Sequence, residues 1–397
     1  MFGWEFPPLH SGGLGVACRG LVRGLTQNGV RVTLVLPRDA GVSETDVSFL
    51  HPTAEQCALL HVPSGIRPYD TEQSYRTRMA GGGSALLDEL YGPDLGEAVE
   101  RFEELSVELT KNVSADVIHC HDWMTFGAGA RAAAHHRKPL VAHVHATEFD
   151  RTNFQPNPWI ADRERRGLMA ADRIIAVSRY TKNLLIRHYG IPADRIAVVH
   201  NAHDTQCLPR CELAVPSIRR DPLVLFLGRL TVQKNPVQFL EVAKRVRESR
   251  PDARFVMAGD GPLFGELVER ACAMGLQEHV LFAGKVTEAE AHSLFADAAC
   301  FVMPSVSEPF GLVALEAVAH GVPVVLSKQS GACEVIEHGF AVDFWDTERM
   351  ADCIVTILRE TPLARQLRSE APRILQKLTW SSQAERVRSI YDNLITS

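Results

Sequence analysis

The chain has 397 residues, and its 42 Lys and Arg against 48 Asp and Glu leave a net charge of −6 with the histidines neutral. Apolar residues make up 46% and charged residues 23%, as in ordinary folded domains, which excludes a disordered or fibrous chain. The basic residues are scattered, so nothing indicates binding to nucleic acid, and contact with a membrane is an open but unsupported alternative. The length predicts two or three domains.

The first residues and the cysteines bear on where the protein works. Residues 1–8 hold Trp4, Glu5 and two prolines, with no basic region before an apolar run, so we expect no signal peptide. No uncharged apolar stretch approaches the ~20 residues that span a bilayer. The nine cysteines form no Cys-x-x-Cys pair, which predicts reduced thiols in a cytoplasmic protein. For Cys207 and Cys211, a redox pair or half of a metal site is the alternative.

Short β-branched runs alternate with longer helical patterns along the whole chain, which is typical of βαβ units and parallel sheets. The strands predicted in the first half cover residues 31–37, 117–120, 140–145, 174–177 and 196–199. Those predicted in the second half cover residues 223–227, 255–257, 280–282, 301–303 and 322–326. The fold class is therefore α/β, with two doubly wound parallel-sheet domains.

The predicted boundaries follow from the segments that lack periodicity. We expect an N-terminal domain over residues 1–205, a proline-containing linker over 206–222 and a C-terminal domain over 223–375. The helical residues 376–397 either extend the second domain or cross back to the first. Residues 51–83, which end in three glycines, predict a loop-rich insertion. Ligands of such folds bind beyond the carboxyl ends of the strands, where the motifs below lie.

The first motif is Ser11-Gly12-Gly13-Leu14-Gly15, before a helix expected to reach about Asn28. Glycines at a helix start let backbone N–H groups approach a phosphate or a sugar oxygen closely. The third glycine of a dinucleotide-binding fingerprint would fall on Cys18, and no Gly-Lys-Ser/Thr of a P-loop follows. A tight turn without a ligand is the alternative.

Histidines and carboxylates gather at two predicted strand ends. They are His119, His121, Asp122, His143, His145 and Glu148. Alternation along a strand places His119 and His121 on the same face, opposite Cys120. A metal site is one interpretation. Hydrogen bonds to polar groups of a ligand are the other, and we favour contacts to a sugar. For His119 and His143, a buried and hydrogen-bonded core histidine is a further alternative.

Two cations follow the first strand of the second half, in Gly228-Arg229 and at Lys234. A planar Arg fork and a Lys point charge at a strand end suit a diphosphate. Two solvated surface cations are the alternative. The turn Gly259-Asp260-Gly261-Pro262 ends the next strand at the same edge of the sheet and carries less weight by itself.

Another motif, residues 307–316, directly follows the strand predicted over 301–303. Glu308 lies in the loop between strand and helix, and Gly311-Leu312 opens the helix, where free N–H groups can hold phosphate. Glu316, about one turn into that helix, can accept hydrogen bonds from a ribose. A solvated helix carboxylate is the alternative.

Together these residues resemble the retaining glycosyltransferases of family 4, whose members include glycogen and starch synthases and sucrose-phosphate synthase. The resemblance covers nearly the whole chain, and its motifs are Trp4 to Pro8, Gly12 to Gly15, His121-Asp122-Trp123, His145 to Glu148, Val177-Ser178, His200-Asn201, Gly228-Arg229 with Lys234, Gly259 to Pro262, and Glu308 with Glu316. It implies a GT-B fold of two Rossmann-like domains that face each other across a cleft. The first domain would bind the acceptor and the second the nucleotide sugar.

The resemblance also implies roles for single residues. The catalytic group is His145, Glu308, Arg229 and Lys234. Donor binding falls to Gly12, Gly13, Arg229, Lys234, Gly259, Phe310, Gly311, Leu312 and Glu316. Acceptor or sugar contacts are expected from His121, Asp122, Glu148 and Asn201. In this set Arg229 and Lys234 bind the diphosphate and Glu316 binds the ribose.

The implied reaction moves a hexose, glucose foremost, from a donor of the UDP-glucose, ADP-glucose or GDP-mannose type to a sugar or glucan hydroxyl, with retention at the anomeric carbon. No cofactor and no metal are expected, since the chain has no Asp-x-Asp and fixed cations can replace a divalent ion. Leu9-His10-Ser11 stands where bacterial glycogen synthases carry Lys-x before the double glycine, which counts against ADP-glucose and polymer elongation.

Four alternatives remain open. The chain can be a sucrose-phosphate-synthase-like enzyme, or a transferase for surface polysaccharides or lipid-linked sugars. It can also be a non-catalytic protein that binds a nucleotide sugar. A pyridoxal-phosphate-dependent glucan phosphorylase shares the two-domain architecture, would need a Schiff-base lysine in the second domain, and would be identified by the release of phosphate rather than nucleotide. The oligomeric state is not predicted.

Overall fold

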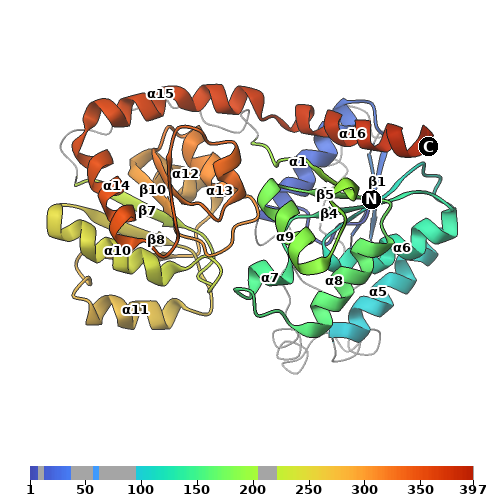
Figure 1. Cartoon of the computed structure of the whole chain (residues 1–397), viewed down its shortest axis with the longest axis horizontal. Helices are drawn as coiled ribbons and strands as arrows, with labels where there is room; N and C mark the ends of the chain where they lie inside the picture. The colour runs from blue at the N-terminus through green and yellow to red at the C-terminus, as the bar shows by residue number, and fades with distance from the viewer. Residues whose placement is uncertain (8–12, 37–56, 62–94, 204–220, 397) are drawn as a thin grey trace. The chain divides into compact units, whose positions relative to one another are not determined.

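The computed structural model describes residues 1–7, 13–36, 57–61, 95–203 and 221–396 (Figure 1). They fall into two compact units, each with its own parallel sheet. Unit 1 comprises residues 1–147, 157–202 and 380–397, and unit 2 comprises residues 148–156 and 203–379. Gly12, Cys207, Cys211 and residues 206–220 of the predicted linker lie outside the described residues.

Unit 1 is built around parallel strands. The strands are β1 (Val32–Leu36), β2 (Cys57–His61), β3 (Ile118–His121), β4 (Leu140–Val144), β5 (Arg173–Ala176) and β6 (Ile196–Val198). Its α-helices are α1 (Gly13–Gln27), α5 (Leu95–Thr110), α6 (Trp123–His136), α8 (Pro158–Ala170), α9 (Arg179–Tyr189) and α16 (Trp380–Thr396), with a 3₁₀ turn at Ala193–Arg195. Strands β3 to β6 pair in sequence order, and β1 pairs with β2. Phe2 bridges Val35 of β1 and Cys120 of β3, so the first residues connect the two sets of strands.

Of the loop-rich insertion predicted over residues 51–83, the structure describes only residues 57–61, and at these the prediction missed strand β2. Residues 57–61 form a strand that pairs in parallel with β1, Val32 opposite Cys57 and Leu36 opposite His61. The apolar run Ala58-Leu59-Leu60 is the reason, because it suits a strand of a parallel sheet. The many turn-forming residues around this short run outweighed its signal in the sequence.

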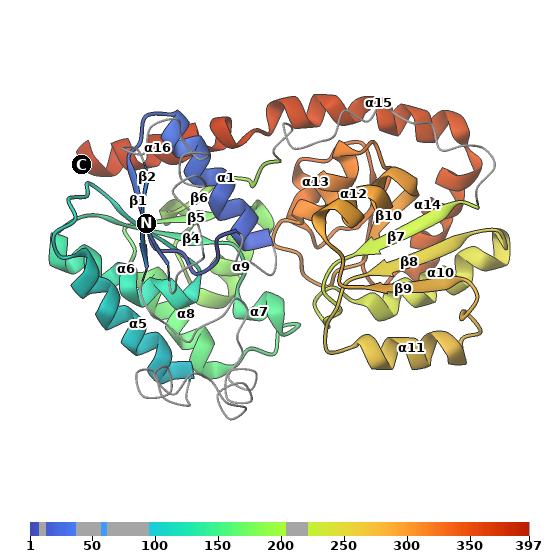
Figure 2. The same cartoon turned by 180° about the vertical axis from the view of Figure 1, so that it is seen from behind.

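Unit 2 is a six-stranded parallel sheet with helices on both faces (Figure 2). The strands are β7 (Leu223–Leu227), β8 (Arg254–Ala258), β9 (Val280–Gly284), β10 (Ala298–Met303), β11 (Val324–Ser327) and β12 (Phe340–Val342). The α-helices are α7 (Glu148–Arg151), α10 (Pro236–Ser249), α11 (Phe264–Ala273), α12 (Glu288–Asp297), α13 (Leu312–Ala319), α14 (Thr347–Arg359) and α15 (Thr361–Lys377), with a 3₁₀ turn at Gly331–Glu334. Of these elements, β12 was not predicted, whereas the other five strands lie within a few residues of their expected positions.

The strand order of unit 2 locates its ligand-binding edge. The sheet runs β12-β11-β10-β7-β8-β9, so the chain starts in the middle at β7, winds outward to β9 and then restarts at β10 on the other side. This is the doubly wound order in which ligands bind where the winding reverses, beyond the carboxyl ends of the two central strands. The loops after β7 and β10 therefore frame the candidate site.

The core of unit 2 holds that sheet rigid. Alternate residues of β7, Val224 and Phe226, are buried against α10, α11 and α14. The ring of Phe239 on α10 packs 5.5 Å from the ring of Phe226 and 6.1 Å from that of Phe255 on β8. A close-packed core beneath the loops gives the site residues a fixed base.

In unit 1, α16 packs directly on α1, with glycines at the crossing. A Cβ on Gly24 would lie 2.5 Å from the carbonyl oxygen of Trp380, and one on Gly20 would lie 2.1 Å from its ring. Asn28 Nδ2 donates to the carbonyl of Ser381 at 2.9 Å. Small residues at the crossing allow the two helices to approach this closely.

We expect Gly24→Ala to lower the melting temperature, because the added methyl must push a backbone carbonyl away, at a cost of about 1–3 kcal/mol. Thermal unfolding followed by circular dichroism measures the effect. Gly265→Ala on α11 is the matched control, since a Cβ there meets open space and alanine favours the helix by up to about 1 kcal/mol. Equal melting temperatures for Gly24→Ala and the parent would contradict the close helix crossing.

Among the residues that the structure describes, no helix has both the length and the apolar character that a membrane crossing requires.

Candidate functional site

The loops after β7 and β8 in unit 2 meet backbone to backbone. Gly228 N–H donates to the carbonyl of Ala258 at 3.0 Å, and Leu230 N–H donates to that of Asp260 at 2.9 Å. Gly259 has φ 141°, and a Cβ on it would lie 1.9 Å from the carbonyl oxygen of Gly228. Only glycine fits such a position. The predicted donor residue Gly259 thus keeps the two loops in contact.

An ion pair joins the loops on the two sides of the reversal point. Lys234 Nζ contacts Glu308 Oε2, and Ser305 Oγ donates to the same oxygen at 3.2 Å. Glu308 is 5% exposed, so its negative charge is held away from water and needs these partners. The solvated-cation alternative is therefore wrong for Lys234. Arg229, at the end of β7, lies partly exposed in the same loop.

The backbone from Glu308 to Leu312 is fixed by the loop after β11. Glu308 N–H donates to the carbonyl of Gln329 at 2.8 Å, and the carbonyl of Phe310 accepts from Ala332 N–H at 2.6 Å. Gly311, with φ 98°, forms the N-cap of α13, and Leu312 is the first helical residue, as predicted. A Cβ on Gly311 would lie 2.9 Å from Met303 Cε. The turn into α13 is consequently rigid.

Glu316 lies on α13 and is only partly exposed. Burial of its carboxyl, followed by the negative charge of Glu288, raises the pKa of Glu316 to about 7. A carboxyl with so high a pKa is half protonated near neutral pH. Its ionised form gains more from a hydrogen-bond donor than an exposed glutamate would.

In unit 1, Asp122 directly follows β3 in a strained backbone conformation, with φ 57° and ψ 171°. Its carboxylate accepts from His145 N–H at 2.7 Å and from Ala146 N–H at 3.4 Å, and its own N–H donates to the carbonyl of His143. A non-glycine residue in this region costs about 1–3 kcal/mol, and such residues cluster at functional sites. Asp122 therefore ties the end of β3 to the turn that carries His145.

His145 follows β4 at the rim of the same sheet and is 9% exposed. Its Nε2 shares a hydrogen bond of 2.9 Å with His121 Nδ1, while its Nδ1 has no hydrogen-bond partner among the described residues. Burial lowers the pKa of His145 to about 3, so the ring is neutral at physiological pH. A neutral imidazole with one nitrogen unoccupied can donate to or accept from a hydroxyl group.

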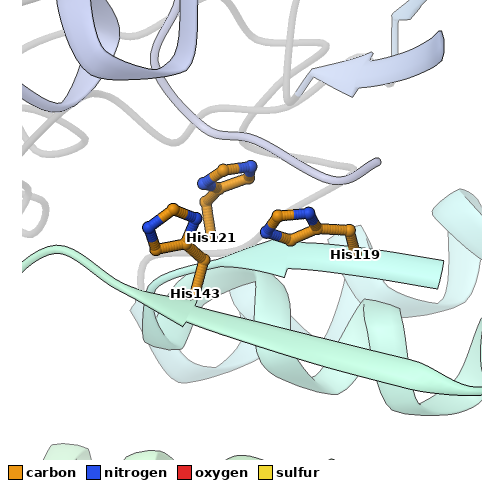
Figure 3. Close-up of side chains that lie close together, drawn as sticks. All are labelled: His119, His121 and His143. Carbon is orange, nitrogen blue, oxygen red and sulfur yellow. The ribbon is translucent and has the colours of Figure 1, made fainter. Parts of the chain in front are cut away.

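His119, His121 and His143 lie within the strands rather than after them, and all three are buried (Figure 3). The rings of His119 and His121 stack 4.5 Å apart on one face of β3, as alternation predicts. The alternative of a hydrogen-bonded core histidine is wrong for His143, because neither of its ring nitrogens has a partner in the described part of the chain.

The remaining predicted residues are placed as follows. Gly13 is the first residue of α1. Glu148 is buried at the start of α7, and its segment belongs to unit 2, whereas His145 belongs to unit 1. Asn201 is buried after β6.

Four polar residues around the loop that carries Glu308 were not among the predicted site residues: Gln233, Ser305, Ser307 and Asp150. Gln233 Nε2 donates to the carbonyl of Ser307 at 3.0 Å, and Ser307 Oγ donates to Asp150 Oδ1. Ser305, Ser307 and Asp150 are fully buried. The alternating serines before Glu308 were the available signal, because two small polar residues directly after a buried strand need nearby partners.

Two family models together match most of the chain. The model described as Glycosyltransferase Family 4 matches residues 11–207, and the model described as Glycosyl transferases group 1 matches residues 214–374. The two matches correspond to the two halves that the strand pattern indicates.

Two curated relatives match most of this chain in sequence. The glycogen synthase of Mycobacterium tuberculosis is 27% identical over 98% of this chain and 93% of its own length. The D-inositol 3-phosphate glycosyltransferase of Paenarthrobacter aurescens is 30% identical over 83% of this chain and 79% of its own length.

Solved structures share the fold. The sucrose-phosphate synthase of Thermosynechococcus elongatus superposes with a TM-score of 0.78 at 20% identity, covering 100% of this chain and 98% of its own. The HepE protein of Anabaena in complex with UDP-glucose superposes with a TM-score of 0.69 at 19% identity, covering 99% and 98%. The chain therefore belongs to the glycosyltransferases of family 4 and has the two parallel-sheet α/β domains of the GT-B fold.

Proposed function

We propose that the chain is a retaining hexosyltransferase that moves a hexose, glucose foremost, from a nucleotide sugar to a hydroxyl group of a sugar or glucan. The observation that carries this proposal is the Lys234–Glu308 pair at the reversal point of the unit 2 sheet. It combines a cation for a leaving diphosphate with a buried carboxylate for sugar hydroxyls.

Lys234 and Arg229 stabilise the negative charge that develops on the departing diphosphate. The ammonium group of Lys234 has three N–H donors, so it can bind a phosphate oxygen without leaving Glu308. Positive groups that are already in position lower the barrier because nothing must reorganise as the charge develops. The first turn of α13, after Gly311, adds backbone N–H groups on the same edge of the sheet.

Glu308 binds the hydroxyl groups of the transferred sugar. Lys234 and Ser305 both contact Oε2, which leaves Oε1 to accept from sugar hydroxyls. Glu316 accepts from the ribose of the nucleotide. His145 of unit 1, neutral and with Nδ1 unoccupied, contacts the transferred sugar as well.

The donor class is supported by the HepE structure, which holds UDP-glucose on the same fold. Donors of the ADP-glucose and GDP-mannose types are the alternatives to UDP-glucose. The glycogen synthase relative supports a glucan acceptor, and the sucrose-phosphate synthase structure supports a small phosphorylated sugar. The three-residue stretch before Gly12, which counts against ADP-glucose, lies outside the described residues.

A nucleotide-release assay tests the proposal. The full chain is given UDP-glucose, ADP-glucose, GDP-mannose or UDP-N-acetylglucosamine, each with and without maltooligosaccharide, fructose 6-phosphate or a lipid acceptor. We expect release with one hexose donor that depends on one acceptor, and an α-linked product by NMR from an α-linked donor. A product of inverted configuration would contradict retention. Release from no donor, together with no nucleotide binding by calorimetry, would favour the non-catalytic alternative.

A further inference from the structure

The histidines His119, His121 and His143 in unit 1 form a buried cluster that the proposed reaction does not use. Their side chains are 2%, 0% and 3% exposed. The register of the sheet sets His121 of β3 directly opposite His143 of β4, with His119 two residues earlier on the same face. One ring nitrogen from each residue lies within 4.8 Å of the other two. Figure 3 shows the three rings gathered on one face of the two strands.

The hydrogen bonds of the cluster leave one set of nitrogens unoccupied. His119 Nδ1 contacts the hydroxyl of Tyr391, and His121 Nδ1 lies 2.9 Å from His145 Nε2. Nε2 of both residues, and both nitrogens of His143, have no hydrogen-bond partner among the described residues. A buried polar atom without a partner costs about 1–3 kcal/mol, so four of them in one place require an explanation.

The chemistry of these rings suits a metal ion. Each of the three rings has at least one nitrogen without a hydrogen-bond partner among the described residues, and a neutral imidazole offers the lone pair of such a nitrogen to a metal ion. In metal sites the second nitrogen of a ligating histidine is held by an outer partner, as Tyr391 holds His119 and His145 holds His121.

We propose that His119, His121 and His143 bind a divalent transition metal ion of the kind that imidazole prefers, Zn²⁺ foremost. Zinc bonds of 2.0–2.1 Å in a tetrahedral site set ligand nitrogens roughly 3.4 Å apart, so the nitrogens must approach by up to about 1.4 Å. The three rings are stacked on one another, so they must also turn until their in-plane lone pairs point at the ion. Tyr391 and His145 are the outer partners. This differs from the sequence-based expectation, which weighed a metal site at these histidines, favoured contacts to a sugar and expected no metal.

The ion would also set the tautomer of His145. A metal on Nε2 of His121 leaves the proton on Nδ1, which then donates to His145 Nε2. His145 must accordingly carry its own proton on Nδ1 and present a donor. This consequence for sugar binding rests on the proposed function, whereas the binding of the metal does not.

Metal content and metal titration of the full chain, without any sugar, test the site. After chelator treatment, the parent is titrated with Co²⁺ and Zn²⁺, and bound metal is counted by elemental mass spectrometry. We expect one ion per chain, a tetrahedral Co²⁺ absorption spectrum that Zn²⁺ abolishes, and a melting temperature that rises with Zn²⁺. Tyr391→Phe should weaken binding by about 10–100-fold, and His143→Asn should weaken it further.

His292→Asn in unit 2 is the matched control and should bind metal as the parent does. A parent that holds no Zn²⁺ or Co²⁺ after loading would overturn the proposal. So would equal binding by the parent and His143→Asn, because the ion would then lie elsewhere. If His143→Asn does not fold, the parent stoichiometry and the Tyr391→Phe affinity decide the matter. Sugar transfer by a chain that binds neither Zn²⁺ nor Co²⁺ after loading would leave the proposed function standing and the metal site refuted.

Discussion

Lys234→Ala is expected to reduce turnover with the preferred donor by about 10²–10³-fold, since it removes a positioned cation from the departing diphosphate. The substitution should lower kcat more than it raises KM, because the charge on the leaving group is greatest in the transition state. Steady-state nucleotide release over a range of donor concentrations measures both constants. A change confined to KM would show that Lys234 binds the donor without assisting its cleavage.

Lys328→Ala is the matched control for this prediction. Lys328 also pairs with a carboxylate in unit 2, its Nζ lying 2.8 Å from Asp343 Oδ2, but both of these groups are more exposed than the Lys234–Glu308 pair. Exposed pairs contribute about 0–1 kcal/mol to stability, and the proposal gives this one no part in the reaction. Turnover should be unchanged in Lys328→Ala. An equal loss in both variants would contradict a specific role for Lys234.

Removing Lys234 also leaves Glu308 buried with Ser305 as its remaining partner, which should destabilise unit 2 by about 3 kcal/mol. The double variant Lys234→Met with Glu308→Gln separates this effect from catalysis. Without either charge the fold should recover most of its melting temperature, whereas turnover should stay low. Recovery of turnover in the double variant would show that the lysine serves only to neutralise Glu308.

The predictable part of this molecule is the part that depends on residues close together in the chain. Apolar runs identified five of the six unit 2 strands, and Gly311-Leu312 marked the start of α13 because a helix start is a local signal. The strand order of unit 2 explains why the family motifs lie at the ends of strands. Arg229 and Lys234 follow β7 and Glu308 follows β10, which are the two strands at the reversal point.

The parts that escaped prediction depend on contacts between distant residues. Strand β2 is five residues long and is stabilised by its pairing with β1, which its own sequence does not encode. Asp150 reaches Ser307 across 157 positions of the sequence. The unoccupied nitrogens of His143 become visible only when β3 and β4 are paired, since a strand pattern predicts the face of a side chain but not its partners.

Glu316→Gln is expected to stabilise the protein and to weaken donor binding, two effects of opposite sign from one carboxyl. In the folded chain the pKa of Glu316 is raised from its usual 4.5 to about 7 by burial and by Glu288. Between these two values the unfolded chain loses the proton while the folded chain keeps it, so stability falls as pH rises and the loss is complete above about pH 7. Glutamine cannot ionise, and the gain of Glu316→Gln over the parent should grow from pH 5 to pH 8, to about 3 kcal/mol. Glu269→Gln, an exposed carboxylate on α11, should show no such growth.

Donor affinity should move the other way. An ionised Glu316 accepts hydrogen bonds from ribose hydroxyls better than a protonated one, so the affinity of the parent for the nucleotide should increase as pH rises through about 7. Glu316→Gln should bind the nucleotide about 10–100-fold more weakly at pH 8, the loss expected for a hydrogen bond to a charged acceptor, and its affinity should no longer rise across this range. Calorimetry with the nucleoside diphosphate at pH 6 and pH 8 measures both. If the stability gain of Glu316→Gln grows with pH but the variant binds the nucleotide as tightly as the parent, then Glu316 is a buried carboxyl that does not contact the ribose. If instead Glu316→Gln binds the nucleotide more weakly but gains no stability as pH rises, then Glu316 is ionised in the free enzyme and contacts the ribose without the burial that raises its pKa.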